Sequence, residues 1–163
     1  GDYAVQAVVT SKRGTGAASG FVHVTGDVIS FTPFTSAEQP WLFDADGSQS
    51  DGSVFDGHAR YADGNAHFTY RFDIPSDVTG GTLTLDIGNQ YLVQVSPDNQ
   101  TWSTVLEATG LTGDTGLMNR AERSLDLNDI RGSSRTLYVR VSDDYPPDGW
   151  GGWLAHVRLE LQH

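Results

Sequence analysis

The 163-residue chain has no cysteine, one methionine and one lysine, Lys12. The absence of cysteine excludes disulfide scaffolds, thiolate zinc sites and cysteine nucleophiles. No apolar run approaches the roughly 20 residues that a membrane-spanning helix needs. The first residues also lack a basic segment followed by an apolar stretch, so we expect no signal peptide in them.

Positive charge is scarce as well. Lys and Arg number 10 against 21 Asp and Glu, which gives a formal net charge of −11. Such a field repels phosphate backbones and anionic lipid, so we expect neither a nucleic-acid partner nor a membrane partner. A soluble, salt-tolerant surface would show the same acidity.

The plentiful residues belong to turns rather than to helices. Aspartate supplies most of the acids, and the chain has 19 glycines. Both residue types favour turns and loops that bind hard cations, whereas the glutamates and lysines of exposed helix faces are few. The composition therefore favours an all-β fold.

Short alternating segments separated by turn residues are typical of a sandwich or barrel. We expect a loop over residues 11–20, a hairpin turn over residues 25–27 and one helical turn within residues 126–131. Residues 1–30 are expected to form an N-terminal strand or linker segment, and residues 31–163 one β-sandwich module. The predicted strands cover residues 3–10, 21–24, 28–31, 67–74, 82–87, 91–96, 101–106, 123–127, 135–141 and 153–161.

Three segments are similar to known sequences. Residues 89–102, NQYLVQVSPDNQTW, resemble a hairpin of discoidin-like, galactose-binding-fold domains, with Asn99 where glycine is usual. Residues 55–74 and 137–153 resemble the entry and closing segments of β-sandwich modules in secreted bacterial glycan-degrading enzymes. The resemblance implies a single-domain jelly-roll β-sandwich, usually with one structural Ca²⁺, that often acts as a carbohydrate-binding module. It names no sugar, because one scaffold hosts many ligands.

A calcium site is expected in the long, irregular stretch from residue 32 to residue 63. Residues 44–52, DADGSQSDG, combine carboxylates with flexible glycines, as Ca²⁺ ligation requires. The discoidin-like resemblance adds an Asp-Gly step and a Glu near the chain end. The predicted metal ligands are Asp44, Asp46, Asp51, Asp56 and Glu160. The alternative is a solvated acidic turn.

A sugar site is expected at the loop end of the sandwich. Sugar rings stack on aromatic side chains, and their hydroxyls need polar groups beside that platform. Residues 145–150, YPPDGW, hold two aromatics and a carboxylate on a backbone stiffened by proline. The predicted carbohydrate-binding residues are Trp41, His58, Arg120, Tyr145, Asp148 and Trp150. The alternatives are that Trp150 or Trp153 covers the core and that Trp102 packs within its hairpin.

Catalysis is not expected. A glycosidase needs two carboxyl groups about 5–10 Å apart across a cleft. Asp143 and Asp144 are adjacent in sequence, so in a strand they would point to opposite faces. The chain has no Gly-x-Ser-x-Gly elbow and no histidine spacing of a zinc site.

The sequence thus predicts a secreted, monomeric, calcium-stabilised carbohydrate-binding module of a larger glycoside hydrolase or lyase. Its partner would be a polysaccharide or oligosaccharide, most simply a neutral or basic one, unless Ca²⁺ or local arginines offset the acidic field. Two alternatives stay open. A structural spacer on a catalytic domain predicts buried loop aromatics, and a cell-surface adhesion domain predicts a contiguous exposed apolar patch.

Overall fold

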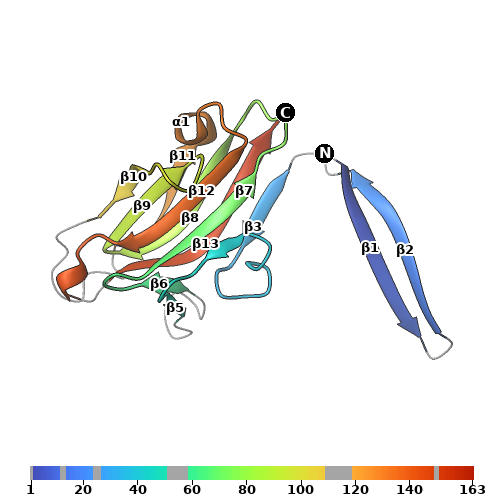
Figure 1. The fold of residues 1–163 in the computed structure, drawn as a ribbon, viewed down its shortest axis with the longest axis horizontal. Helices are drawn as coiled ribbons and strands as arrows, with labels where there is room; N and C mark the ends of the chain where they lie inside the picture. The colour runs from blue at the N-terminus through green and yellow to red at the C-terminus, as the bar shows by residue number, and fades with distance from the viewer. Residues whose placement is uncertain (1, 12–13, 24–26, 51–58, 109–118, 149–150) are drawn as a thin grey trace.

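A computed structural model describes residues 2–11, 14–23, 27–50, 59–108, 119–148 and 151–163. It contains two packed antiparallel sheets, and this confirms the predicted all-β sandwich (Figure 1). The jelly-roll connectivity stays a prediction.

The first sheet has five strands in the order β10-β9-β12-β7-β4. Its strands are β4 (Leu42–Asp44), β7 (His67–Asp73), β9 (Tyr91–Ser96), β10 (Ser103–Glu107) and β12 (Thr136–Asp143). The second sheet has the order β11-β8-β13-β6-β5, and β3 also pairs with β13. Its strands are β3 (Val28–Phe31), β5 (Gln49–Ser50), β6 (Arg60–Ala62), β8 (Gly80–Asn89), β11 (Ala121–Asp126) and β13 (Gly152–Gln162).

The core lies between the sheets because each long strand alternates apolar and polar residues. In β12, Leu137, Val139 and Val141 are buried, whereas Tyr138 and Arg140 are only partly buried. The expected helical turn is present as α1 (Leu127–Arg131), which starts at an Asp126 side-chain cap. A short 3-10 helix, η3 (Pro146–Asp148), lies between β12 and β13.

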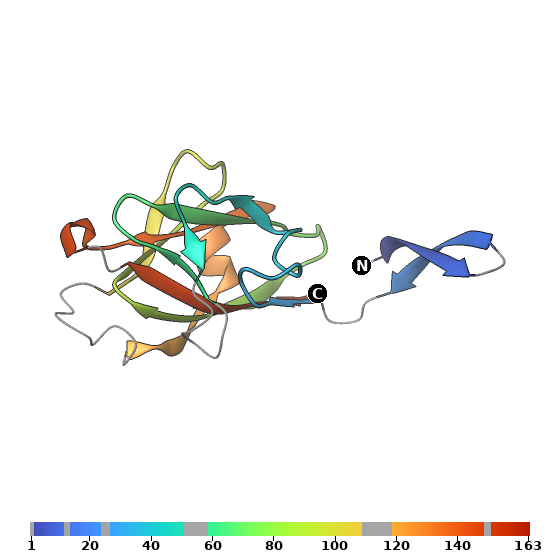
Figure 2. The ribbon, with the colours of Figure 1, turned by 90° about the horizontal axis from the view of Figure 1, so that it is seen from below.

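The N-terminal segment forms a separate two-stranded sheet of β1 (Asp2–Ser11) and β2 (Gly14–His23). Figures 1 and 2 show this hairpin standing apart from the sandwich. The loop expected over residues 11–20 was therefore wrong, because β2 pairs along its whole length with β1. The hairpin expected between residues 21–24 and 28–31 was also wrong, because β3 pairs with β13 instead.

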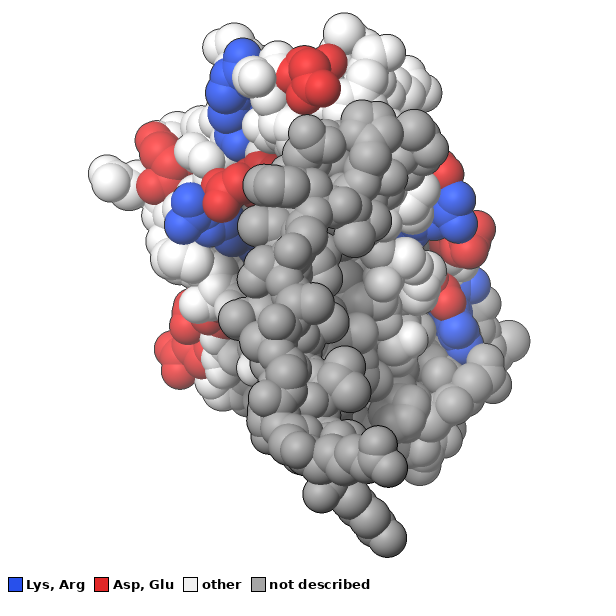
Figure 3. Space-filling view, turned by 90° about the vertical axis from the view of Figure 1, so that its right-hand side faces the viewer, with Lys and Arg blue, Asp and Glu red and all other residues white. Residues whose placement is uncertain are grey.

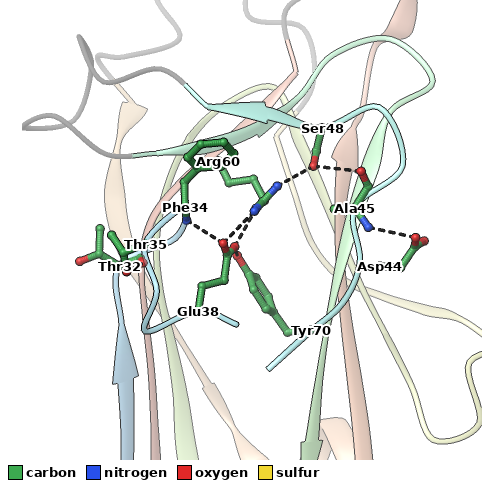
Figure 4. Close-up of polar contacts among 9 residues, drawn as sticks. All are labelled: Thr32, Phe34, Thr35, Glu38, Asp44, Ala45, Ser48, Arg60 and Tyr70. Carbon is green, nitrogen blue, oxygen red and sulfur yellow. Dashed lines mark hydrogen bonds and ion pairs between the residues drawn. The ribbon is translucent and has the colours of Figure 1, made fainter. Parts of the chain in front are cut away.

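A buried ion pair fixes the irregular stretch before β4 to the core (Figure 4). The Glu38 carboxylate is fully buried and accepts hydrogen bonds from Arg60 Nε and Nη2, each 2.7 Å away. Tyr70 Oη donates to Glu38 at 2.7 Å, and the Phe34 amide donates at 2.8 Å. Burial and the Glu38 charge raise the pKa of Tyr70 well above its usual range, so its hydroxyl keeps the donated proton.

Candidate functional site

The outer side of the five-stranded sheet carries aromatic and arginine side chains. We call Phe43, Arg71, Trp102, Tyr138 and Arg140 the aromatic–arginine face. Tyr138 and Arg140 are two residues apart on β12, so both point away from the core. Phe43 and Arg71 come from β4 and β7, and Trp102 immediately precedes β10. The face therefore gathers residues that lie far apart in the sequence.

Phe43 and Tyr138 contact each other across β7. Their ring centroids are 5.1 Å apart with an interplanar angle of 79°, an edge-to-face geometry that aromatic pairs prefer. Phe43 is nevertheless 48% exposed, so much of its ring faces solvent. The Arg71 guanidinium lies 5.9 Å from the Tyr138 centroid, and strand register places these two residues opposite each other. The result is an open platform with a cation at its edge.

Arg140 stacks on the second part of this platform. Its guanidinium carbon lies 3.9 Å from the Trp102 ring centroid, well within cation–π range. Its Nε donates to the hydroxyl of Thr69, the residue opposite it on β7, at 3.3 Å. Burial lowers the pKa of Arg140, and the nearby charge of Asp44 opposes that change. The guanidinium is therefore held in one orientation and partly shielded from water.

A shallow hollow of about 270 Å³ opens beside Phe43. A β-bulge between Leu42 and Asp44 shapes this edge of the sheet. Arg71 and Asp73 form an exposed ion pair there at 2.9 Å. The residues that line the hollow are Pro40, Trp41, Leu42, Phe43, Arg71 and Asp73. The hollow thus offers an apolar wall together with hydrogen-bond donors and acceptors.

The predicted sugar residue Trp41 lines this hollow. Its ring stacks on Phe72 with centroids 5.8 Å apart, and its carbonyl accepts a hydrogen bond from the Arg71 amide. Trp41 is therefore partly buried and joins the core to the aromatic–arginine face.

Tyr145 and Asp148 lie at a different place, the loop between β12 and β13. Tyr145 is 50% exposed, and Asp148 accepts a hydrogen bond from Gln90 Nε2 at 2.5 Å. The loop is anchored by Asp143, which accepts from the amides of Tyr145 at 2.7 Å and Gly64 at 2.8 Å. Burial raises the pKa of Asp143, and the charge of Asp148 adds to the rise.

The other predicted sugar residues do not join either place. Arg120 precedes β11 on the six-stranded sheet and forms a bidentate ion pair with Asp86, with N–O distances of 2.6 to 3.1 Å. His58 and Trp150 lie outside the described residues. The predicted sugar set is thus divided between the aromatic–arginine face, the β12–β13 loop and the second sheet.

The predicted calcium ligands are also divided. Asp44 Oδ1 accepts from the Ala45 amide at 2.9 Å, and its Oδ2 lies 2.8 Å from His67 Nε2. The Asp46 carbonyl accepts from the His67 amide, whereas Glu160 lies on the other sheet in an ion pair with Arg158.

Asp51 and Asp56, the remaining two predicted ligands, lie outside the described residues. Within the described ranges, no group of three or more His, Asp or Glu side chains is arranged to hold a metal ion. Calcium binding by the 44–63 segment stays a prediction.

Sequence reasoning missed most of the aromatic–arginine face. Trp102 was expected to pack within its hairpin, but it contacts Arg140 from β12. The alternation in β12 was the available signal, since it places Tyr138 and Arg140 opposite the core residues. Trp153 is buried, at 7% exposed, and stacks on Tyr61 with ring centroids 4.3 Å apart. The residue that joins the core cluster is its neighbour Leu154.

Comparisons with known proteins give little more. No protein-family model matches the chain. No curated protein is similar to it at a significant level. One similar solved structure is a family GH115 4-O-methyl-alpha-glucuronidase with specificity for decorated arabinogalactans, at a TM-score of 0.41 and 13% identity. The likeness covers 71% of this chain but 16% of that one, so this chain spans a small part of the enzyme's length. In the part of the chain that is described, no helix is long and apolar enough to cross a membrane.

Proposed function

We propose that this chain is a non-catalytic carbohydrate-binding module that holds its glycan on the aromatic–arginine face. One observation supports this function above the others. Three aromatic side chains, Phe43, Tyr138 and Trp102, lie on the same solvent-facing side of one sheet. Accessible rings give sugar C–H faces an apolar surface, and neighbouring polar groups orient the hydroxyls.

The hollow beside Phe43 supports the binding of a small polar ring. Its volume of about 270 Å³ is just below the roughly 300–1,000 Å³ of typical small-molecule pockets. Arg71 supplies N–H donors and Asp73 supplies acceptor oxygens at its edge. A sugar unit needs both kinds of partner, whereas a flat apolar docking surface for a protein would offer neither.

The carboxylates beside the face support binding rather than hydrolysis. Glycoside hydrolysis needs one carboxyl group that donates a proton to the leaving oxygen. Asp73 is paired with Arg71, and Asp44 is paired with His67. Both carboxylates are thus already engaged by a neighbouring basic side chain.

The wider role of the module is part of the same proposal. It would be a secreted, monomeric unit that brings a larger glycoside hydrolase or lyase to its polysaccharide. A structural Ca²⁺ in the Asp-rich segment 44–63 would order that segment without contacting the sugar. Both statements extend the sequence analysis, and the response of the melting temperature to EDTA tests the calcium statement.

Affinity electrophoresis against a panel of soluble polysaccharides tests the function. We expect at least one polysaccharide to retard the protein, and the double variant F43A/Y138A to lose that retardation. The matched control is Tyr145→Ala, because Tyr145 and Phe43 are equally exposed but lie in different places. Loss of binding in the control alone would move the site to the β12–β13 loop. Retardation by no polysaccharide would contradict the function and favour a structural spacer.

A further inference from the structure

We propose that the glycan carries carboxylate groups and that Arg140 binds one of them. This inference rests on the proposed function, because it assigns the ligand class of the aromatic–arginine face. It differs from the neutral or basic glycan that the net charge of −11 favours.

Arg140 has no carboxylate partner within ion-pair distance among the residues that the structure describes. Its contacts are the Thr69 hydroxyl and the Trp102 ring. Four other arginines are neutralised directly: Arg60 by Glu38, Arg71 by Asp73, Arg120 by Asp86 and Arg158 by Glu160. Arg123 and Arg131 bind a hydroxyl, carbonyl oxygens and an amide oxygen, but within the described ranges neither stacks on a tryptophan as Arg140 does. Figure 3 shows the same pattern on one side of the molecule, where basic and acidic side chains lie next to one another.

The orientation of Arg140 leaves the two terminal nitrogens of its guanidinium available to a ligand. A guanidinium carries five N–H donors, of which Nε uses one toward Thr69. The two terminal nitrogens hold the other four and have no partner among the described residues. The Arg140 side chain is only partly buried. Two parallel N–H groups match the two oxygens of a carboxylate.

The surroundings of Arg140 strengthen its attraction for an anion. The stack on Trp102 removes one side of the guanidinium from water, and a partly desolvated charge interacts more strongly than a fully hydrated one. Asp44, the acidic group that acts on Arg140, is itself hydrogen-bonded to His67. No carboxylate of the described ranges pairs directly with Arg140, so a ligand carboxylate would be a direct counter-ion that these ranges do not supply.

The position of Arg140 fits a sugar ring that stacks on Tyr138. Tyr138 and Arg140 are two residues apart on β12, which corresponds to about 6.6 Å along a strand. A uronic acid ring stacked on Tyr138 would have its carboxylate within reach of the terminal N–H groups of Arg140. At about 0.15 M salt, the long-range repulsion from the acidic protein is screened beyond roughly 8 Å, and this direct contact is kept.

The test compares acidic oligosaccharides with neutral forms of the same chains. Oligogalacturonate, glucuronoxylan oligosaccharides and oligoalginate are titrated into the whole chain by calorimetry at 0.15 M salt. Each is paired with its carboxyl-reduced counterpart, which keeps the linkage and loses the charge. We expect at least one acidic oligosaccharide to bind about tenfold tighter than its reduced form, which corresponds to about 1.4 kcal/mol.

Variants of Arg140 identify the group responsible. Arg140→Gln should remove the preference for the acidic form, so that this variant binds the acidic and the reduced oligosaccharide with equal affinity. Arg140→Lys keeps the charge and the aliphatic stem but loses the two parallel N–H donors of the guanidinium, so it should retain part of the preference. This variant also provides a test if Arg140→Gln unfolds. The control is Arg158→Gln, an exposed arginine on the other sheet, which should change neither affinity.

Two outcomes overturn the inference in different ways. Equal affinity of the acidic and reduced forms, unaffected by Arg140→Gln, would remove the carboxylate assignment and leave glycan binding intact. The absence of binding to all six oligosaccharides, together with the absence of retardation in the polysaccharide panel, would remove the proposed function itself.

Discussion

The guanidinium carbon of Arg140 lies 3.9 Å from the ring centroid of Trp102. The two residues come from β12 and from the start of β10, and β9 lies between these strands. The contact therefore ties the hairpin after β9 to the open side of the sheet. Among the described residues no carboxylate lies within ion-pair distance of Arg140, and its neighbour Trp102 is a partly exposed aromatic ring.

Trp102→Leu should weaken glycan binding without unfolding the sandwich. The substitution removes the ring that orients Arg140, and cation–π contacts of this kind contribute about 0.5–2 kcal/mol. We expect affinity for the acidic oligosaccharide to fall by roughly 2- to 30-fold, which is the same energy expressed as a binding ratio. Calorimetric titration measures the affinity, and urea unfolding measures the stability. Unchanged affinity in a folded variant would contradict the role given to Trp102.

Glu38→Gln should strongly destabilise the fold. It would leave the buried Arg60 guanidinium without its counter-ion, and breaking a buried ion pair costs about 3–5 kcal/mol. The matched control is Glu160→Gln, which breaks the exposed pair with Arg158 and should cost about 0–1 kcal/mol. Urea unfolding of both variants gives the comparison. Equal losses of stability would show that the Glu38 cluster does not anchor the stretch before β4.

Asp98 should titrate at an unusually low pH. Hydrogen bonds from the amides of Thr101 and Gln100, with a third from the Ser96 hydroxyl, lower the pKa of Asp98 from 3.8 to about 2. A lowered folded-state pKa means that the ionised group stabilises the turn above pH 3.8 and loses this effect as the pH falls toward 2. An NMR titration of the Asp98 carboxyl carbon measures this directly. A midpoint near 3.8 would be inconsistent with the hydrogen-bonded turn.

Calcium removal should lower the melting temperature. A ligand that binds only the folded state stabilises it by mass action, so EDTA should cost several degrees and excess CaCl₂ should restore them. Asp56→Asn should abolish this response. Asp77→Asn is the control, because Asp77 lies outside the 44–63 segment and contacts His163. A melting temperature that EDTA does not change would contradict the calcium proposal.

The long strands could be predicted because their side-chain pattern is local. β7, β8, β12 and β13 each alternate apolar and polar residues, and the observed strands match the predicted ones to within about two residues at most ends. Asn99 stands where glycine is usual in the tight turn after β9, and its φ of 58° is one that asparagine tolerates. These features depend on the residues of one short segment, so they can be predicted without knowing which strands pair.

Strand pairing was harder to predict because it depends on distant residues. β2 contains Gly, Ala and Ser residues that have little tendency to form strands alone, yet β1 provides a full-length partner. β3 pairs with β13, near the other end of the chain, rather than with the segment just before it. The sequence alone did not reveal either partner.

The candidate site was missed for the same reason. Tyr138 and Arg140 are visible as the polar side of an alternating strand, but their neighbours come from β4, β7 and the start of β10. Phe43 lies in a stretch that was expected to be irregular. Tyr145 could be predicted as a candidate because its motif is local in the sequence. The aromatic–arginine face could not, because it forms only when the strands of the sheet are paired.

NMR mapping of the glycan contact tests the central claim most directly. The assigned protein would be titrated with the tightest-binding oligosaccharide of the panel, and amide and side-chain shifts would be followed. The account predicts the largest changes at Phe43, Arg71, Tyr138 and the Trp102 indole, with small ones at Tyr145. Changes confined to Tyr145 and Asp148 would contradict it, because they would place the glycan on the β12–β13 loop.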